Sequence, residues 1–393
     1  MTVGCAPALG RADGHEVRRN DVSLQELHLP VVVNAPGTWS SEEGVRGPVA
    51  ALGLATRTRT DGVFDDKQSL AVFAVSAVDG SASWIDLPGF SLERWGFVGG
   101  FDVSPDGQWI GWVRLQQGAR PGRVRVAGWA VMNTNTGQVR RLEDPDFPWV
   151  RGTMADLEFS GDSRYLLTSY ETPDHPSVSR SHGHQLVAWD VEDGAPTVIE
   201  QPGHYWLPNL GSAPTGVVWA RGREVFRADP VTGDRTSVAV PQHVVTASWG
   251  PDGTSFAYIG RPSVGSRAPW RLYAGRTVAQ ARGREVDLPS DVQAGELLGW
   301  RDATHVVVGH YRRTVHVVDI VTGDVEAVDM AGYGDQVNAP YLASALWQQP
   351  LGTPVEPEGT TDPRRPWRWG GAAVLVAAVG AVLVRRRHSR HRL

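Results

Sequence analysis

The chain contains very little cysteine and lysine. Cys5 is the single cysteine among 393 residues, so no disulfide can form within the chain and its stability must come from packing. Lys67 is the single lysine among 38 basic residues, while Ala, Gly, Val and Arg abound. This composition indicates the coding bias of a high-GC bacterium, of which the actinobacteria are the obvious example.

Several enzyme signatures are also absent. Without a Gly-x-Ser-x-Gly elbow, we expect no serine hydrolase domain in the chain. It has no His-Glu-x-x-His, no Cys-x-x-Cys and no phosphate-cradling glycine loop, and we expect no cofactor. The first thirty residues contain no apolar core long enough for a signal peptide. Thr2–Cys5 resembles the end of a lipoprotein cleavage site, as expected if translation began further upstream.

Basic residues are scarce outside the C-terminal segment. Eight arginines and one Asp lie from residue 362 onward, and the rest of the chain carries 30 basic and 42 acidic residues, a net charge of −12. A nucleic acid would require a basic face for its phosphates. We therefore expect no nucleic-acid partner.

Two tetrapeptides stand out among the residues that are present. Ser104–Gly107 and Gly250–Gly253 each separate a short apolar run from a run with Trp or Phe. A type I turn favours Pro at its second position and accepts Asp at its third, and Gly supplies the positive φ that leads into the next strand. Leu157–Leu166 and Leu298–Val307 are weaker copies of the same pattern. The recurrence indicates a repeat fold.

A second turn motif accompanies the first. An apolar run ends in a polar residue, and a Gly follows four positions later. The polar side chain can bond the backbone two residues on, while Gly takes the left-handed conformation that closes the hairpin. The five pairs are Ser76 and Gly80, Asn133 and Gly137, Asp190 and Gly194, Asp229 and Gly233, and Asp319 and Gly323.

Together the two motifs predict a four-stranded antiparallel meander, shown most compactly by Gly299–Val328. Units begin near residues 50, 101, 157, 206, 247 and 298, at intervals close to the ~40 to 45 residues of a propeller blade. We therefore predict an all-β fold, a β-propeller of six blades, with seven as the alternative. Gln25–Val33 and Ala339–Trp347 lie outside the six units. One of them completes a blade from the opposite terminus, or the two together build a seventh.

The turn motif resembles the WD-like repeats of the TolB type, whose blades carry an apolar-x-Ser-Pro-Asp-Gly core. The match is good at Phe101–Trp112 and Ser248–Ile259 and fair at Leu157–Thr168. The resemblance implies a six-bladed propeller that binds partners, often in the bacterial envelope. It implies no single chemistry, since this fold carries many functions.

The C-terminal part has the pattern of a membrane anchor. Gly370–Val384 has no polar side chain, and with Trp367 and Trp369 it reaches eighteen residues, near the lower limit of the ~17 to 25 that cross a bilayer. Trp at one end and Arg385, Arg386 and Arg387 at the other are typical interface anchors. The five arginines after the span place the C-terminus in the cytoplasm and the propeller outside. An inward-facing propeller with a tail anchor is the alternative if the chain starts as written.

The predicted organisation has five parts. Five prolines between Gln349 and Pro366 indicate an extended stalk that holds the propeller off the membrane. The parts are a disordered segment at 1–21, the propeller at 22–348, the Pro-rich linker at 349–366, the transmembrane helix at 367–384 and a basic cytoplasmic tail at 385–393.

Tryptophan is abundant, with sixteen residues. Those at strand positions, such as Trp84, Trp112 and Trp189, are expected between the blades. Trp149, Trp206 and Trp270 fall in Pro- and Gly-rich connections, where they are candidates for a peptide- or glycan-binding face.

Two polar clusters contain residue types that bind metals. His182 and His184 would point to the same side of a strand, and His175, Asp174 or His204 would have to complete a metal shell. Because no third ligand is defined, we expect a solvated loop and no metal. Asp61, Asp65 and Asp66 lack the spacing of a calcium loop and predict an exposed hairpin loop.

Two functions follow. The first is a non-enzymatic, membrane-tethered binding module for a protein, peptide or glycan. The alternative is a hydrolase or lyase that uses channel-facing carboxylates, with or without a metal on the histidines. The sequence alone does not identify which acids face the channel.

Overall fold

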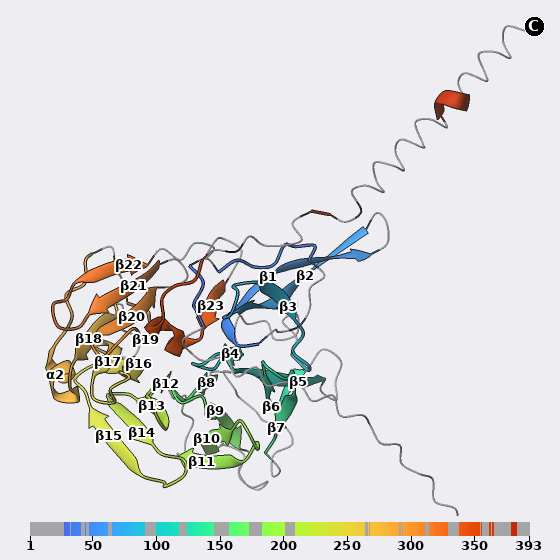
Figure 1. The fold of residues 1–393 in the computed structure, drawn as a ribbon. Helices are drawn as coiled ribbons and strands as arrows, with labels where there is room; N and C mark the ends of the chain where they lie inside the picture. The colour runs from blue at the N-terminus through green and yellow to red at the C-terminus, as the bar shows by residue number, and fades with distance from the viewer. Residues whose placement is uncertain are drawn as a thin grey trace, which may run out of the picture.

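Six antiparallel sheets surround a central axis as the blades of a β-propeller (Figure 1). The computed structural model describes residues 27–31, 33–40, 44, 47–61, 65–90, 100–117, 124–144, 157–172, 183–200, 209–263, 266, 268–290, 292, 294–310, 314–328, 338–353, 355, 361–362, 364 and 379–382. Within these residues five sheets have four strands and one has three. The predicted six-bladed, all-β fold is confirmed.

The blades follow one another along the chain. Blade 1 contains β1 (Val49–Asp61), β2 (Asp65–Ser76) and β3 (Ala82–Ile85); blade 2 contains β4 (Phe101–Val103), β5 (Trp109–Gln117), β6 (Val124–Asn133) and β7 (Val139–Leu142); blade 3 contains β8 (Leu157–Phe159), β9 (Tyr165–Thr172), β10 (Gly183–Asp190) and β11 (Pro196–Glu200). Blade 4 contains β12 (Asn209–Gly211), β13 (Val217–Arg221), β14 (Glu224–Ala228) and β15 (Arg235–Ala239); blade 5 contains β16 (His243–Trp249), β17 (Phe256–Arg261) and β18 (Arg271–Gly275); blade 6 contains β19 (Glu296–Trp300), β20 (His305–His310), β21 (Thr314–Asp319) and β22 (Val325–Val328).

Blade 5 differs from the others at its outer edge. The helix α2 (Val278–Gly283) follows β18, and Thr277 caps it by accepting a hydrogen bond from the N–H of Gln280. The chain then returns to pair with β18 only through an isolated bridge between Tyr273 and Glu285. This bridge takes the place of a fourth strand.

Both predicted turn motifs lie where the repeat pattern places them. In the β4–β5 turn the N–H of Gly107 donates to the carbonyl of Ser104 at 2.8 Å, and Gly107 has a φ of +73°. The five Asx- or Ser-led turns close the outer hairpins by the same means, with each Gly N–H bonded to the polar residue's carbonyl. In blade 3, Ser163 takes the left-handed conformation at a φ of 60° in place of Gly.

The ring closes through a strand from the C-terminal side. β23 (Asn338–Leu342) pairs antiparallel with β1 and becomes the inner strand of blade 1. Of the alternatives that the sequence leaves open, this is completion of a blade from the opposite terminus. The 3-10 helix η2 (Ser344–Gln348) follows and contacts β19 of blade 6. Trp347 of η2 donates from Nε1 to the carbonyl of Leu298 at 3.1 Å, which joins the first and last blades.

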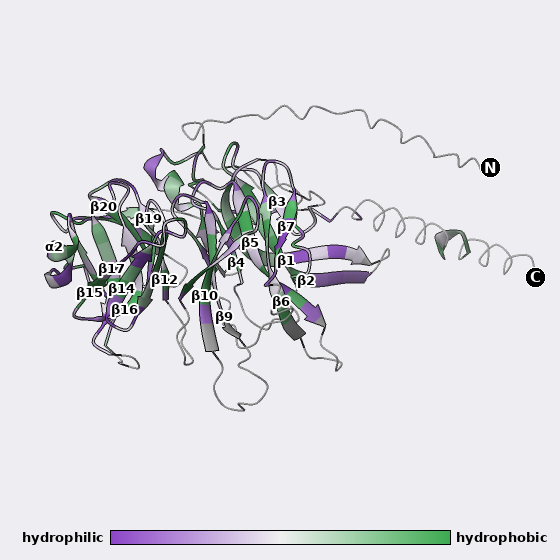
Figure 2. Cartoon of the chain, turned by 90° about the horizontal axis from the view of Figure 1, so that it is seen from below, coloured by the Kyte–Doolittle hydropathy of each residue, from purple (hydrophilic) through white to green (hydrophobic). Residues whose placement is uncertain are grey.

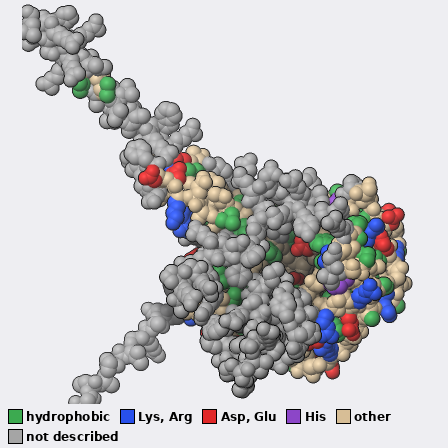
Figure 3. All heavy atoms as spheres, turned by 180° about the vertical axis from the view of Figure 1, so that it is seen from behind, with side chains coloured by type: hydrophobic (Ala, Val, Ile, Leu, Met, Phe, Trp, Pro, Cys, Tyr) green, Lys and Arg blue, Asp and Glu red, His purple; other side chains and the backbone are tan. Residues whose placement is uncertain are grey.

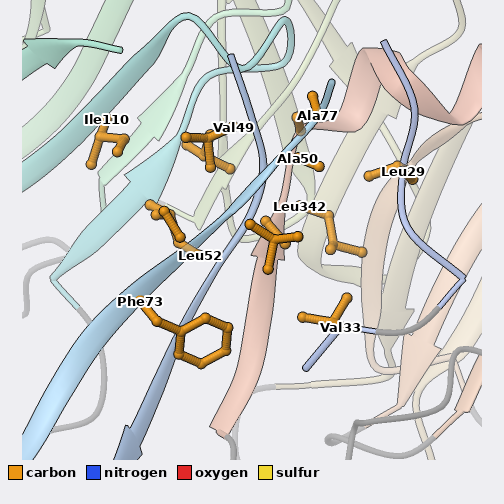
Figure 4. Close-up of a cluster of buried hydrophobic side chains, with 14 of the residues drawn as sticks. Leu29, Val33, Val49, Ala50, Leu52, Phe73, Ala77, Ile110 and Leu342 are labelled. Atoms are coloured by element: carbon orange, nitrogen blue, oxygen red, sulfur yellow. The ribbon is translucent and has the colours of Figure 1, made fainter. Parts of the chain in front are cut away.

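The N-terminal residues strengthen this closure. Leu29 and Val33 are buried in the same hydrophobic cluster as Val49 of β1 and Leu342 of β23 (Figure 4). The N–H of Gly352 donates to the carbonyl of Leu29 at 2.8 Å, so the segments before and after the propeller lie side by side. Two separate contacts between the chain ends therefore protect the seam of the ring.

The described residues of the predicted linker contact the propeller. Leu351 packs against the hydrophobic cluster of blade 1, and Arg364 is only 8% exposed. Arg364 bonds the carboxylates of Asp66 and Asp362, donates to the carbonyl of Asp65 at 2.8 Å and lies over the ring of Trp39. Arg364, within the predicted linker, therefore contacts the end of the β1–β2 hairpin.

That hairpin is long, with paired residues from Val49 and Ser76 to Asp61 and Asp65. Its outer part is hydrophilic and projects from the ring (Figure 2). Asp65 and Asp66 are exposed there, as predicted for a hairpin loop.

The predicted membrane span lies mostly outside the described residues. Only residues 379–382 of the range 367–384 are described, and they are helical. Within the portion of the chain that the structure covers, no helix has the length and apolar character needed to cross a bilayer.

Tryptophan side chains fill the layers between blades. Trp129 lies 6.0 Å from Trp189, measured between ring centroids, where blades 2 and 3 meet. Of the predicted core tryptophans, Trp109 alone is only partly buried. The buried ones are Trp84, Trp112, Trp129, Trp189, Trp219, Trp249 and Trp300.

Candidate functional site: an acidic cavity in the channel

The inner strands of the blades surround a cavity of about 90 Å³ on the propeller axis. Asp102 of β4, Glu158 of β8 and Glu296 of β19 line it, together with Tyr341 of β23 and Ser344 of η2. These residues come from four blades and from the segment that closes the ring. The cavity therefore exists only when the ring is closed.

Asp102 is the most buried carboxyl group of the cavity, with 9% of the residue exposed. Its carboxyl group accepts hydrogen bonds from the backbone N–H of Val103, at 2.8 Å, and of Phe159 in the neighbouring blade. Burial raises the pKa of Asp102 to about 8, against the effect of these two hydrogen bonds, and the charge of Glu296 adds to the rise. Asp102 is therefore largely protonated at neutral pH.

Glu296 stands at the start of β19, open to the solvent of the cavity although protein surrounds most of its carboxyl group. This desolvation raises the pKa of Glu296 above its ordinary value. Glu158 contributes a third carboxyl group from the middle of β8. Three acids thus line one cavity, and the charge of Glu296 opposes ionisation of Asp102.

Neutral polar groups complete the wall and fix its shape. Ser212 follows β12 and shares a hydrogen bond of 2.9 Å with Ser248 of β16. Ser248 also accepts from Nε1 of Trp300 at 2.9 Å, which links blades 4, 5 and 6. Ser344 is held at the cavity because the N–H of Ala345 donates to the carbonyl of Pro105 at 3.0 Å.

This arrangement suits two kinds of chemistry. A cation in the cavity would be attracted by the carboxylates and would reduce the repulsion between them. A protonated Asp102 beside an ionisable Glu296 could also serve as a general acid and base pair.

Among the residues predicted as ligand-face or metal candidates, the structure describes Trp270 in full, and Trp270 does not line this cavity. Trp270 packs against the hydrophobic core shared by blades 5 and 6. His184 lies in β10, paired in register with Glu171, while the other histidine candidates and the membrane-anchor residues are outside the described residues. Those outside are Asp174, His175, His182, His204, Trp149, Trp206, Trp367, Trp369, Arg385, Arg386 and Arg387.

No group of three or more His, Cys, Asp or Glu within the described residues is arranged to hold a metal ion. This holds for the channel carboxyls as well. A metal site at His175, His182 and His184 stays a hypothesis from the sequence.

Sequence reasoning missed the channel acids, although the repeat contains a signal for two of them. Asp102 and Glu158 occupy the same position of the inner strand, two residues before the turn serine. Inner strands line a propeller's axis, so an acid repeated at this position was a candidate channel residue. Glu296 has no such signal, because the equivalent position of β19 is Gly299.

Comparison with known proteins finds similarity to solved structures alone. No protein-family model matches the chain, and no curated protein matches it significantly. An oligogalacturonate lyase in complex with manganese is 13% identical, with 77% of each chain covered and a TM-score of 0.42. The acylaminoacyl peptidase of Pyrococcus horikoshii is 14% identical over 72% of this chain and 45% of the peptidase, with a TM-score of 0.44.

A puromycin-hydrolysing peptidase of Mycobacterium tuberculosis is 16% identical over 72% of this chain and 46% of the peptidase, with a TM-score of 0.37. The chain thus spans less than half of the length of either peptidase. At these identities the likeness concerns the propeller fold alone. The protein is a six-bladed β-propeller with an acidic channel.

Proposed function

We propose that this protein is a membrane-tethered propeller of the TolB type that binds a protein or peptide partner through its acidic channel, without catalysing a reaction. The observation that carries the proposal is the convergence of Asp102, Glu158 and Glu296 in one cavity. Carboxyl groups gathered in this way disfavour anions and favour a positively charged group.

The size of the cavity narrows the ligand further. A volume of about 90 Å³ holds roughly six to nine water molecules, since one water needs ~10–15 Å³ measured in this way. The tip of one Lys or Arg side chain fits in this space, and the acidic lining favours its positive charge. The proposed partner is therefore a protein or peptide that inserts a basic side chain.

The binding test uses butylammonium as a probe and butanol as its uncharged control. The purified full chain in a neutral detergent is titrated with each by calorimetry at pH 7 in two buffers of different ionisation enthalpy. Because Asp102 is protonated at this pH, the cation should displace up to about one proton on binding. The same titration of Asp102→Asn should show no proton release. Failure of butylammonium to saturate the protein would contradict the proposal.

The tether and its orientation are also part of the proposal. Residues 367–384 provide the span, and the arginines that follow favour a cytoplasmic C-terminus, with the propeller outside the cell. Protease added to intact cells should then digest the propeller. Protection in intact cells with digestion after lysis would show that the propeller faces inward.

The enzymatic alternative is favoured by one observation, the elevated pKa of Asp102 beside Glu296. A hydrolase or lyase of this kind would protonate a leaving group with Asp102 and use Glu296 as the base. A panel of glycosides, uronides and peptides should then yield turnover that Asp102→Asn abolishes while Asp287→Asn, at an exposed site, retains it. Butylammonium binding without turnover would support the binding module.

A further inference from the structure

Three basic side chains meet where blades 4 and 5 adjoin, and none of them lines the channel cavity. His243 is the first residue of β16 and Arg261 is the last residue of β17, and the two are paired directly across the sheet. Arg223 lies in the tight turn between β13 and β14. Cross-strand partners have Cβ atoms only ~5 Å apart, so His243 and Arg261 are immediate neighbours.

Backbone hydrogen bonds hold Arg223 against this pair. The N–H of Val244 donates to the carbonyl of Gly222 at 2.8 Å, and the N–H of Val240 donates to the carbonyl of Arg223 at 2.8 Å. The guanidinium of Arg223 then reaches blade 5 and donates to the carbonyl of Pro262 at 3.2 Å. Pro262 follows Arg261 directly, and the charge of Arg223 acts on the imidazole of His243.

Two nitrogen atoms in this group are buried without a hydrogen-bond partner, namely Nε of Arg261 and Nδ1 of His243. A buried polar atom left unpaired costs about 1–3 kcal/mol, and more when it belongs to a charged group. Two such atoms in adjacent residues are uncommon in folded proteins, and an anion would pair with them after a small rotation of either side chain toward it. Both atoms are capable of donating a hydrogen bond.

The electrostatics of the group indicate the sign of that ligand. Desolvation lowers the pKa of His243, and the charges of Arg261 and then Arg223 lower it further, while a contact with the backbone of Val244 acts in the opposite direction. The charges that act on this imidazole are thus positive. Figure 3 shows basic (blue), acidic (red) and His (purple) side chains side by side on one part of the ring surface.

We propose that Arg223, His243 and Arg261 form a binding site for a phosphate group. Two permanent guanidinium charges match a phosphate dianion, and its oxygens can accept from both guanidinium groups and from the imidazole. The site is separate from the acidic channel, and its existence does not depend on the function proposed there. The group belongs to a free phosphorylated molecule or to a phospholipid headgroup, which share this chemistry.

The test measures phosphate binding by the full chain in a neutral detergent. Inorganic phosphate is titrated at constant ionic strength, and the His243 imidazole is followed by NMR. We expect saturable binding together with a rise in the pKa of His243, because the anion opposes the two arginine charges. Arg261→Gln removes a charge-assisted donor and should weaken binding about ten-fold or more.

Arg276→Gln is the matched control, because Arg276 is an exposed arginine just after β18 whose substitution changes the net charge equally. It should bind phosphate like the unmodified protein. If Arg261→Gln does not fold, Arg223→Gln replaces it, since Arg223 is exposed in a turn and its loss should also weaken binding. Equal weakening in the control, or phosphate binding that never saturates, would overturn the proposal.

Vesicles of phosphatidylcholine with and without phosphatidic acid distinguish the two sources. A lipid headgroup is the ligand if phosphatidic acid adds binding that Arg223→Gln removes. A free phosphorylated molecule is the ligand if inorganic phosphate saturates the site and phosphatidic acid adds nothing. Absence of binding in both arms contradicts the site.

Discussion

Replacing Asp102 by Asn should make the propeller more stable at neutral pH. The carboxyl has a pKa of about 8 in the folded protein against 3.8 for an ordinary Asp, so the folded state binds the extra proton between these pH values. Stability conferred by a raised acid pKa is present at low pH and is lost as pH rises toward the folded value. Between these pKa values the free energy of unfolding falls by about 1.4 kcal/mol per pH unit, so titration of Asp102 lowers it by roughly 4 kcal/mol at pH 7.

An Asn at this position keeps an acceptor for the N–H groups of Val103 and Phe159 and cannot ionise. Its amide can also donate to an ionised Glu296. Urea unfolding of Asp102→Asn between pH 5 and 8 should therefore show a free energy of unfolding that is less dependent on pH than in the unmodified protein. The difference should grow as the pH rises.

Asp287→Asn is the control for this measurement, because Asp287 is exposed and lies outside the cavity. It removes the same charge and should leave the pH dependence unchanged. A pH dependence in Asp102→Asn equal to that of the unmodified protein would refute the reasoning. So would a loss of stability at pH 8.

Two further changes test the contact between blades 1 and 2 and the attachment of the segment after η2. A Cβ on Gly107 would lie 2.3 Å from the carbonyl oxygen of Val49 in blade 1, whereas one on Gly253, at the same turn position and a similar φ, meets nothing within 4 Å. In urea unfolding, Gly253→Ala should lower the free energy of unfolding by ~1 kcal/mol, because alanine is disfavoured in the left-handed conformation. Gly107→Ala should lower it by a further ~1–3 kcal/mol, because its Cβ clashes with blade 1. Equal decreases in the two variants would contradict the contact between blades. Arg364→Ala should free the segment after η2 and increase limited proteolysis between residues 353 and 364 several-fold, while the ring stays folded. Arg364→Lys should have an intermediate effect, because it keeps the charge but loses the bidentate geometry; unchanged cleavage in both variants would indicate that Arg364 does not hold the segment.

The repeat was predictable because its turns depend on local chemistry. Gly107 and Gly253 take positive φ whatever surrounds them, and Asp or Asn at the outer turns bonds N–H groups only two or three residues away. The register in which β23 pairs with β1 was not predictable. The pairing of Leu52 with Tyr341 depends on contacts between residues far apart in the chain.

The docking of Arg364 shows the same limit. Five prolines predict an extended segment, but composition carries no information about an ion pair between Arg364 and Asp66 of a distant hairpin. The phosphate site proposed at Arg223, His243 and Arg261 is equally hidden in the sequence. Its three members are brought together by strand pairing and a turn contact rather than by spacing.

Blade 1 stays incomplete during most of the synthesis of the chain, because its inner strand β23 is made last. β1 leaves the ribosome roughly 290 residues before its partner β23, which at typical rates of elongation is about 15 to 60 seconds. Throughout that time the inner edge of the first blade has no strand beside it, and an unpaired edge is a hazard for aggregation. The N-terminal residues around Leu29 are made earliest and already belong to the same cluster. They are therefore well placed to protect the first blade while the rest of the ring is being made.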